Sequence, residues 1–338
     1  MDSLTQIVLG AAVGEIIAGR RLGYRAALWG AIGGTIPDLD VFSALFVDPV
    51  SYLTVHRGFS HSIFFAPLLA PLFATIPWLL HRKHLDEFKI WFKIMFWALL
   101  THPILDTFTG YGTQLLNPFS NYGFEINSIF IIDPIFTLPF LFFLILSTVV
   151  YRKKYDRTKW AKIGIIISTV YLVSTVFMKF NAEYRIRESA ANNNIEINRM
   201  MTIPGPFTSF LWRGLIESND GFHQAYYSVF DNSSELVFHF SPKERSSLDR
   251  FEGTRALEVL TWFSKGYFTV HEDSSGVILN DLRFGSIKGW SGDFDSHVFS
   301  FRLYFDQDQN ATFEQVHNEI DITPDDFRTL LIRKFSVE

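Results

Sequence analysis

Residues 56–80 read HRGFSHSIFFAPLLAPLFATIPWLL, a polar cluster that runs directly into a long apolar stretch. The apolar part, residues 62–80, is long enough to cross a bilayer, which takes about 20 residues of helix. The polar part carries two imidazoles and a guanidinium. Titratable groups beside hydrocarbon persist where they pair, bind an ion or line a wet cavity. This stretch therefore predicts a membrane helix next to a functional site.

Further apolar runs predict an α-helical polytopic membrane domain of about six helices, two of them short. Two runs near the amino terminus are rich in Gly and Ala, a composition that lets helix backbones approach closely in lipid, so we expect a tight helical pair that either spans or re-enters. The short runs are Leu4–Ala18 and Ala26–Ile36, and the longer ones after residue 80 are Phe88–Thr101, Ser128–Val150 and Trp160–Phe180.

The chain changes character near residue 180. Residues 1–180 carry 15 Lys and Arg against 11 Asp and Glu, whereas residues 181–338 carry 15 against 24. Alternating apolar and polar residues in the second part predict strands separated by Gly, Ser, Asp and Asn turns. We expect a membrane domain over residues 1–180 and a soluble, mainly β domain over residues 181–338. The expected strands are Glu235–Phe240, Tyr267–His271, Gly276–Phe284 and His297–Phe305, with a helical segment at Pro242–Lys265.

Composition narrows the chemistry. The chain has no Cys, so a metal ion would be held by imidazole and carboxylate groups rather than by thiolates. The net charge of −5 argues against nucleic acid as a partner. Membrane lipid is the partner that the apolar runs indicate, while the sequence leaves the oligomeric state open.

Basic loops favour the cytoplasm, and this rule orients the chain. The basic residues gather in three loops between apolar runs, at Arg20 to Arg25, Arg82 to Lys89 and Arg152 to Lys162. Placing all three in the cytoplasm puts the polar cluster and the acidic tail on the opposite face. We therefore expect a multi-pass protein of the bacterial cytoplasmic (inner) membrane with an extracytoplasmic carboxy-terminal domain.

The candidate metal ligands are three imidazoles and three carboxylates. His102 and Asp106 are four apart on an expected helix, so both side chains lie on one face. Two carboxylates flank the turn after Pro37, and two imidazoles sit five residues apart. This set suits zinc, or alternatively manganese or iron. The six candidates are Asp38, Asp40, His56, His61, His102 and Asp106.

A bound metal would lower the pKa of its water towards about 7 and polarise a phosphoryl or carbonyl oxygen. Arg57 could orient a phosphate through its planar fork. We take Arg57, Ser60 and Asp40 as candidate catalytic residues, with Thr107, Thr109 and Tyr111 nearby.

Structural interpretations compete with these assignments. The imidazoles and Asp106 could instead form an intramembrane hydrogen-bond network that fixes helix packing. Asp38 and Asp40 could cap a helix, and Arg57 could form a structural salt bridge. Glu15 lies near the expected cytoplasmic end, where helix packing is the favoured role.

Three motifs in order resemble a known family. They are Pro37-Asp-Leu-Asp40, His56-Arg-Gly-Phe-Ser-His-Ser62, and His102-Pro-Ile-Leu-Asp-Thr-Phe-Thr-Gly-Tyr-Gly112 followed by Leu115-Leu-Asn-Pro118. They closely resemble the predicted membrane-bound metal-dependent hydrolases, a family that includes inner-membrane LexA-binding predicted hydrolases. The resemblance covers roughly residues 1–150 and implies metal-dependent hydrolysis. Many members begin Met-Asp-Ser-Leu-Thr-His, whereas this chain has Gln6 where that His would fall, so a ligand role there is lost or replaced.

The leading hypothesis is a membrane-integral hydrolase at the outer face that uses a divalent metal ion, acting on a phosphoester or related bond of a lipid or amphipathic substrate. The alternative is a non-catalytic membrane protein with a structural metal and a partner-binding outer domain. A third is a transporter with a metal or proton path, which the one-sided gathering of polar residues disfavours.

Overall fold

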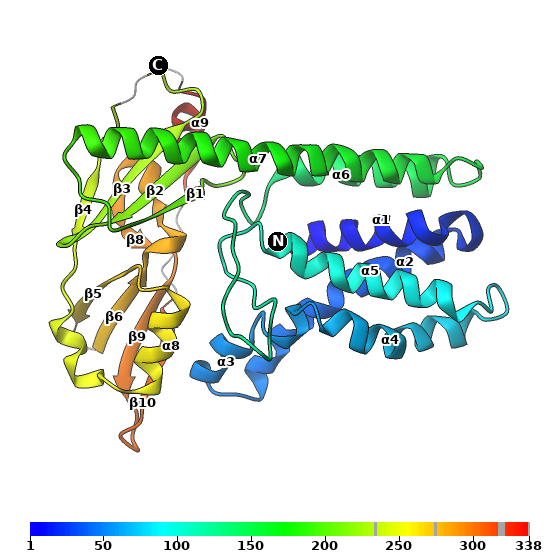
Figure 1. Ribbon diagram of the computed structural model, residues 1–338, viewed down its shortest axis with the longest axis horizontal. Coiled ribbons are helices and arrows are strands. Elements are labelled where there is room, and N and C mark those ends of the chain that lie inside the picture. Colours follow the sequence, from blue (N-terminus) through cyan, green and yellow to red (C-terminus); the bar gives the residue numbers. More distant parts are fainter. Residues whose placement is uncertain (233–234, 274–275, 317–321, 337–338) are drawn as a thin grey trace. The chain divides into compact units, whose positions relative to one another are not determined.

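The computed structural model describes residues 1–338 except 233–234, 274–275, 317–321 and 337–338 (Figure 1). The chain divides into two compact units. We call them the helical unit, Met1–Leu45 with Val55–Val176, and the β unit, Phe46–Thr54 with Phe177–Glu338. An amino-terminal helical region is thus followed by a carboxy-terminal, mainly β region, as predicted.

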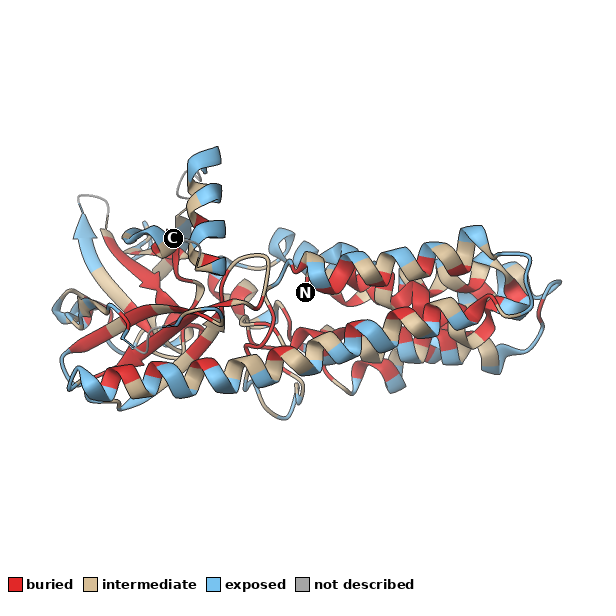
Figure 2. Cartoon of the chain, turned by 90° about the horizontal axis from the view of Figure 1, so that it is seen from above, coloured by how far each residue is buried: buried red, intermediate tan, exposed pale blue. Residues whose placement is uncertain are grey.

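The amino-terminal region contains seven α-helices among the described residues, interrupted by two 3-10 helices and one π-helix. They are α1 (Ser3–Leu22), α2 (Tyr24–Thr35), η1 (Ile36–Leu45), α3 (Pro49–Val55), η2 (Phe59–His61), α4 (Phe65–His81), α5 (Phe88–Asp106), α6 (Pro134–Ile145), η3 (Leu146–Val150) and α7 (Thr158–Asn192). Figure 2 shows that buried residues concentrate on the sides of the helices that face one another.

Two of these helices are long and apolar enough to cross a membrane, α5 with 19 residues and α7 with 35. A third candidate is the pair formed by Pro49–His61 and α4, which are bent by 72° at their junction. The α6 helix begins at Pro134, later than the apolar run predicted, because the Asp133 side chain caps its first turn by accepting from the Ile135 and Phe136 amides. The α7 helix continues past residue 180.

The first two helices pack backbone to backbone, which confirms the predicted tight pair. A Cβ built on Gly30 would lie 2.1 Å from the Gly10 carbonyl oxygen, and one on Gly14 would lie 2.0 Å from that of Ala26. Only glycine allows this approach. Both helices also contact α5, so the pair forms the base on which the last turn of α5 rests.

The basic segments meet at one end of the helical unit. Arg21, at the end of α1, pairs with Glu87, just before α5. Arg20 lies over the ring of Tyr155, 4.4 Å from its centroid, in the turn before α7. In the same region Arg157 donates through Nε and Nη2 to the two carboxylate oxygens of Glu15, at 2.7 and 2.8 Å, in a buried ion pair.

The β unit is built on two four-stranded antiparallel sheets, ordered β1-β2-β3-β4 and β10-β9-β6-β5, with a β7-β8 hairpin. The last turns of α7 pack Ala182, Ile186 and Ala190 onto the first sheet beside Trp212 and Ile216. The strands are β1 (Arg199–Pro204), β2 (Leu211–Glu217), β3 (Gly221–Ser228), β4 (His239–Pro242), β5 (Phe268–Asp273), β6 (Gly276–Asp281), β7 (Ser286–Lys288), β8 (Asp293–His297), β9 (Ser300–Phe305) and β10 (Ala311–Val316).

Strand prediction was partial. The strand expected at Glu235–Phe240 begins only at His239, and the first three strands were not predicted. The helical segment expected at Pro242–Lys265 is split by Gly253, whose φ is +73°, into η4 (Ser246–Phe251) and α8 (Arg255–Phe263). The helical elements that follow are η5 (Leu282–Phe284), η6 (Gly289–Ser291) and α9 (Pro324–Phe335).

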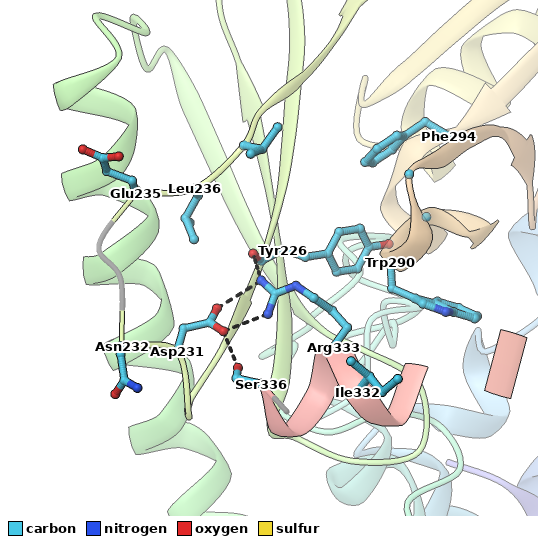
Figure 3. Close-up of a pocket in the computed structure, with 13 residues that line it drawn as sticks. Tyr226, Asp231, Asn232, Glu235, Leu236, Trp290, Phe294, Ile332, Arg333 and Ser336 are labelled. Carbon is cyan, nitrogen blue, oxygen red and sulfur yellow. Dashed lines mark hydrogen bonds and ion pairs between the residues drawn. The ribbon is translucent and has the colours of Figure 1, made fainter. Parts of the chain in front are cut away.

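One cavity of the β unit, of about 600 Å³, lies between the end of β3, the segment around Leu236, the turn after β7 and α9 (Figure 3). Arg333 closes one side by donating to Asp231, at 2.9 and 3.0 Å. Aromatic side chains of Tyr226, Trp290 and Phe294 line the cavity. It contains none of the predicted metal ligands.

Candidate metal centre

Four predicted ligands converge at one end of the helical unit. Asp38 comes from η1, His61 from η2, and His102 and Asp106 from the last turn of α5. One ligand atom of each lies within 4.8 Å of the other three. The side chains of His61, His102 and Asp106 are fully buried, whereas that of Asp38 is 25% exposed. We call this set the four-residue cluster; it could bind a metal ion.

The separations between the ligand atoms fit one ion. The two histidine Nε2 atoms are 3.2 Å apart, and Asp38 Oδ1 lies 3.5 Å from His61 Nε2 and 3.3 Å from His102 Nε2. Asp106 Oδ2 lies 3.6 and 3.9 Å from the same two nitrogens. A tetrahedral ion with bonds of about 2.0–2.2 Å has ligand separations of about 3.3–3.6 Å. Octahedral neighbours at similar bond lengths are about 3 Å apart, so the geometry does not choose the metal.

The protonation pattern also favours a cation. His102 Nδ1 lies 2.6 Å from the carbonyl oxygen of Gly34, which can only accept, so we assign the ring proton to Nδ1 and a lone pair to Nε2. His61 Nδ1 lies 3.1 Å from Asp40 Oδ2, which assigns its proton in the same way. Two lone pairs then face each other across 3.2 Å, an arrangement that a cation between them would stabilise.

Asp40 and His56 lie outside the four-residue cluster. Asp40 Oδ2 accepts from the Ser60 hydroxyl and from the Arg57 amide, both at 2.8 Å, while Asp40 Oδ1 lies 2.8 Å from His56 Nδ1. The Ser60 hydroxyl also lies 3.0 Å from His61 Nδ1. Asp40 thus contacts the far side of a candidate ligand, as carboxylates commonly do behind metal-bound imidazoles. Direct ligation by Asp40 or His56 stays a prediction.

Asp106 is held from the α1 side. Gln6 donates from Nε2 to Asp106 Oδ1 at 2.8 Å and to the carbonyl oxygen of His102 at 3.2 Å. The α-amino group of Met1 contacts the same carboxylate oxygen. Gln6, for which the sequence predicted a lost or replaced ligand role, therefore contacts a candidate ligand through its side-chain amide.

Arg57 is a buried cation beside the cluster. Its Nη1 lies 3.2 Å from Asp106 Oδ2 and 3.5 Å from Thr109 Oγ1, and its guanidinium lies over the Tyr111 ring at 4.7 Å. Its φ of +56° falls in the left-handed region, which costs a residue other than glycine about 1–2 kcal/mol. Within the described part of the chain its Nε has no hydrogen-bond partner. A buried donor in this position can bind an oxyanion.

Both η1 carboxylates are strongly acidic. Burial raises the pKa of Asp38, but donation from Nε2–H of His102 and His61 in their protonated form outweighs it, so the pKa lies well below its usual range; a cation would take the place of those two protons. Burial also raises the pKa of Asp40, but hydrogen bonds from His56 and His61 outweigh it, so this pKa too lies well below its usual range. Both carboxylates are therefore ionised near neutral pH, the state that a cation ligand requires.

Two features differ from the sequence analysis. The Gly34 carbonyl that orients His102 was not foreseen; the only signal was the glycine-rich end of α2, which packs against α1 with Gly34 Cα 3.0 Å from a Cβ built on Gly10. Thr107 donates to the Ile104 carbonyl oxygen at 2.7 Å, a contact within α5 and its end rather than with a candidate ligand.

Comparison with known proteins gives the family. The sequence model described as "YdjM inner membrane protein" matches residues 1–182, more than half of the chain. The chain belongs to this family of inner membrane proteins. It is therefore a membrane protein, in agreement with its apolar helices, and the match includes every residue of the four-residue cluster.

The chain is also similar to a curated protein of Bacillus subtilis (strain 168), described as "Uncharacterized protein YfhP", with 29% identity over 141 residues. The match covers 40% of this chain and 42% of the relative's length. No solved structure is significantly similar to the chain. Hydrolysis and the choice of metal stay predictions.

Proposed function

We propose that the protein is a membrane-integral hydrolase that depends on a divalent metal ion, acting at the outer face of the cytoplasmic membrane on a phosphoester or related bond of a lipid or amphipathic substrate. The observation that carries this proposal is the four-residue cluster with Arg57 beside it. A metal bound there would supply a polarised, acidic water and a Lewis acid for the scissile phosphoryl group. The partly exposed ligand, Asp38, marks the side from which a substrate reaches the cluster.

The location of the cluster supports the outer face. It lies at the carboxyl end of α5, whereas the Arg21–Glu87 pair lies just before the start of that helix. Nineteen helical residues span about 28 Å, close to the thickness of the hydrocarbon core. Because basic segments favour the cytoplasm, the cluster belongs at the opposite interface. From there α6 with η3 would return the chain to the basic turn in the cytoplasm, and α7 would cross again to the side of the cluster, so the carboxy-terminal domain would be extracytoplasmic.

The chain's own residues would divide the work. Arg57 would bind a phosphoryl oxygen through the Nε that lacks a protein partner among the described residues. Asp40 would hold His61 in the tautomer that presents Nε2 to the ion. Ser60, whose hydroxyl contacts both side chains, would hold Asp40 and His61 in place relative to each other. We therefore assign Asp40 and Ser60 positioning roles and keep only Arg57 as a direct substrate contact.

The metal would be zinc, with manganese or iron as alternatives. Two imidazoles and two carboxylates suit all three ions. Zinc is placed first because two imidazoles with a carboxylate and a position open to water are the usual set of catalytic zinc sites.

A second candidate function has its own supporting observation. The cluster joins η1, η2 and α5, three elements far apart in sequence, and three of its four side chains are fully buried. A metal there could hold these elements together without catalysis, leaving the outer domain to bind a partner. We call this structural role the staple. Metal removal would then melt the helical unit instead of stopping a reaction.

Hydrolysis in purified protein tests the proposal. We would assay nanodisc-embedded protein against phospholipids and against bis(p-nitrophenyl) phosphate, with and without a chelator. We expect metal-dependent turnover that Arg57→Lys reduces while thermal unfolding is little changed, because lysine keeps a cation beside Asp106 but loses the planar fork; Arg82→Lys in the basic loop is the matched control. Absence of turnover with zinc, manganese and iron, together with a large chelator-induced drop in the unfolding temperature, would favour the staple instead.

A further inference from the structure

The outer face of η1 is apolar. In a 3-10 helix with three residues per turn, residues three apart share a face. Leu39, Phe42 and Leu45 follow this spacing and are 50%, 57% and 75% exposed. Asp40 and Ser43, also three apart, lie on another face and are only partly exposed. We call Leu39, Phe42 and Leu45 the η1 apolar face.

This surface extends beyond η1. The η2 helix contacts η1 and adds Phe59, which is 38% exposed and lies two residues before His61. Farther along, Phe64 packs edge-to-face against Phe119 with ring centroids 5.3 Å apart, and Phe119 is 81% exposed. Exposed apolar side chains thus border the cluster on two of the elements that supply its ligands.

Lipid is the partner that this surface fits. The η1 helix follows α2 without a break, and α2 also exposes apolar residues, Leu28 and Ile32, at 48% and 38%. Residues 41–47 carry no charge. Leaving a large apolar side chain in water instead of burying it costs about 1.5–3 kcal/mol. In a membrane protein, three such side chains on one face therefore indicate contact with lipid acyl chains.

We propose that the η1 apolar face lies against lipid acyl chains and is the lateral route by which a membrane phospholipid brings its phosphoester to Asp38 and Arg57. The acyl chain would run along Phe42 and Leu39 while the phosphate reaches Arg57 and the cation that the half-buried Asp38 would help to hold on the neighbouring face. This inference rests on the proposed hydrolytic function for the substrate, but the lipid contact itself can be measured without any turnover.

The first test uses the absence of cysteine from the chain, which permits clean single labelling. A nitroxide would be attached to Phe42→Cys in lipid nanodiscs, and its collision rates with oxygen, which partitions into acyl chains, and with an aqueous nickel chelate would be compared. Ser43→Cys, on another face of the same helix, is the matched control. We expect oxygen to dominate at position 42 and both reagents to be weak at position 43. Nickel dominance at position 42, or protection from both reagents, would overturn the lipid contact.

The second test separates the route from the reaction. We expect Phe42→Ser to lower kcat/KM by roughly tenfold for phospholipid in phosphatidylethanolamine and phosphatidylglycerol vesicles. Hydrolysis of the water-soluble bis(p-nitrophenyl) phosphate should not change. Equal rates for the variant and the parent on vesicles would overturn the route. If the parent hydrolyses neither substrate, the proposed function fails, and with it the substrate part of this inference, while the nitroxide data still decide the lipid contact.

Discussion

At the scale of single residues, the geometry of the candidate metal centre depends on which ring nitrogen each histidine directs towards the ion position. His102 and His61 are both held through Nδ1, one by the Gly34 carbonyl and one by Asp40, so both direct Nε2 inward. Orientation of this kind is worth roughly 10–100-fold in metal affinity in known sites. Asp40 should therefore influence metal binding without touching the ion.

Asp40→Asn tests this indirect role. We expect a metal dissociation constant about 10–100-fold higher, because the amide no longer holds the His61 imidazole by charge. Asp106→Asn should be more damaging, since it removes a ligand charge. Competition with a chromophoric chelator measures both, and Asp156→Asn, in the exposed pair with Lys159, is the control. An unchanged affinity in Asp40→Asn would show that Asp40 does not orient the site.

The sequence predicted all four residues of the cluster, but it did not separate them from Asp40 and His56, which lie outside it. The spacing of His102 and Asp106 on a helix correctly puts both on one side, because helical geometry is local. Whether Asp38 or Asp40 turns inward depends on how η1 packs against α5, a tertiary fact that no local pattern encodes. The sequence consequently offered six candidate ligands, and four of them lie in one cluster.

At the scale of elements, α1 and α2 determine where the cluster forms. Their contact at Gly10 and Gly30 is close enough to exclude a methyl group, and it holds the end of α2 where the Gly34 carbonyl meets His102. The opposite end of α1 is fixed by the buried Glu15–Arg157 pair. The α2 helix is thus held at its Gly34 end, and α1 is held towards its other end.

Gly30→Ala should separate this pair. The new methyl group would lie about 2 Å from the Gly10 carbonyl oxygen, and overpacking of this kind costs about 1–3 kcal/mol. We expect a lower unfolding temperature in detergent and weaker metal retention. Leu28→Ala, on the exposed side of α2, is the control and should leave metal retention intact. A Gly30→Ala protein as stable as the parent would refute close packing of α1 on α2.

The two acidic residues paired at the basic end should differ sharply in importance. Glu15→Gln leaves Arg157 buried without its counter-charge, a loss of about 3–5 kcal/mol in comparable buried pairs. Glu87→Gln breaks the Arg21 pair, whose side chains are 48% and 58% exposed, and should cost at most about 1 kcal/mol. Thermal unfolding of the two variants side by side measures this contrast. Similar losses in both would mean that the Glu15 pair is not buried in the native protein.

At the scale of the whole molecule, the chain combines a family-typical helical region with a β region that the family match barely enters. Hydropathy predicted the helical part well, because long apolar runs have few alternatives. Strands were predicted less well: β2 is buried at every position and therefore lacks the alternation that reveals a strand. The side of the membrane on which each unit lies is inferred from the basic loops, and it can be tested directly.

Single-cysteine labelling tests the sidedness. A membrane-impermeant maleimide should label Asp308→Cys, in the β unit, in cells whose outer membrane is opened. Lys153→Cys, in the basic turn before α7, should react only after the inner membrane is permeabilised. The reverse pattern would invert the proposed topology and place the cluster at the cytoplasmic face.

The most direct test of the account is elemental analysis of the purified protein beside a His61→Ala, His102→Ala, Asp106→Ala variant, with thermal unfolding of both. The account predicts stoichiometric divalent metal in the parent protein and its loss from the variant. A variant that still unfolds cooperatively would retain the catalytic proposal, whereas collapse of its unfolding transition would point to a staple. A parent protein that binds no metal under metal-replete conditions would contradict the account.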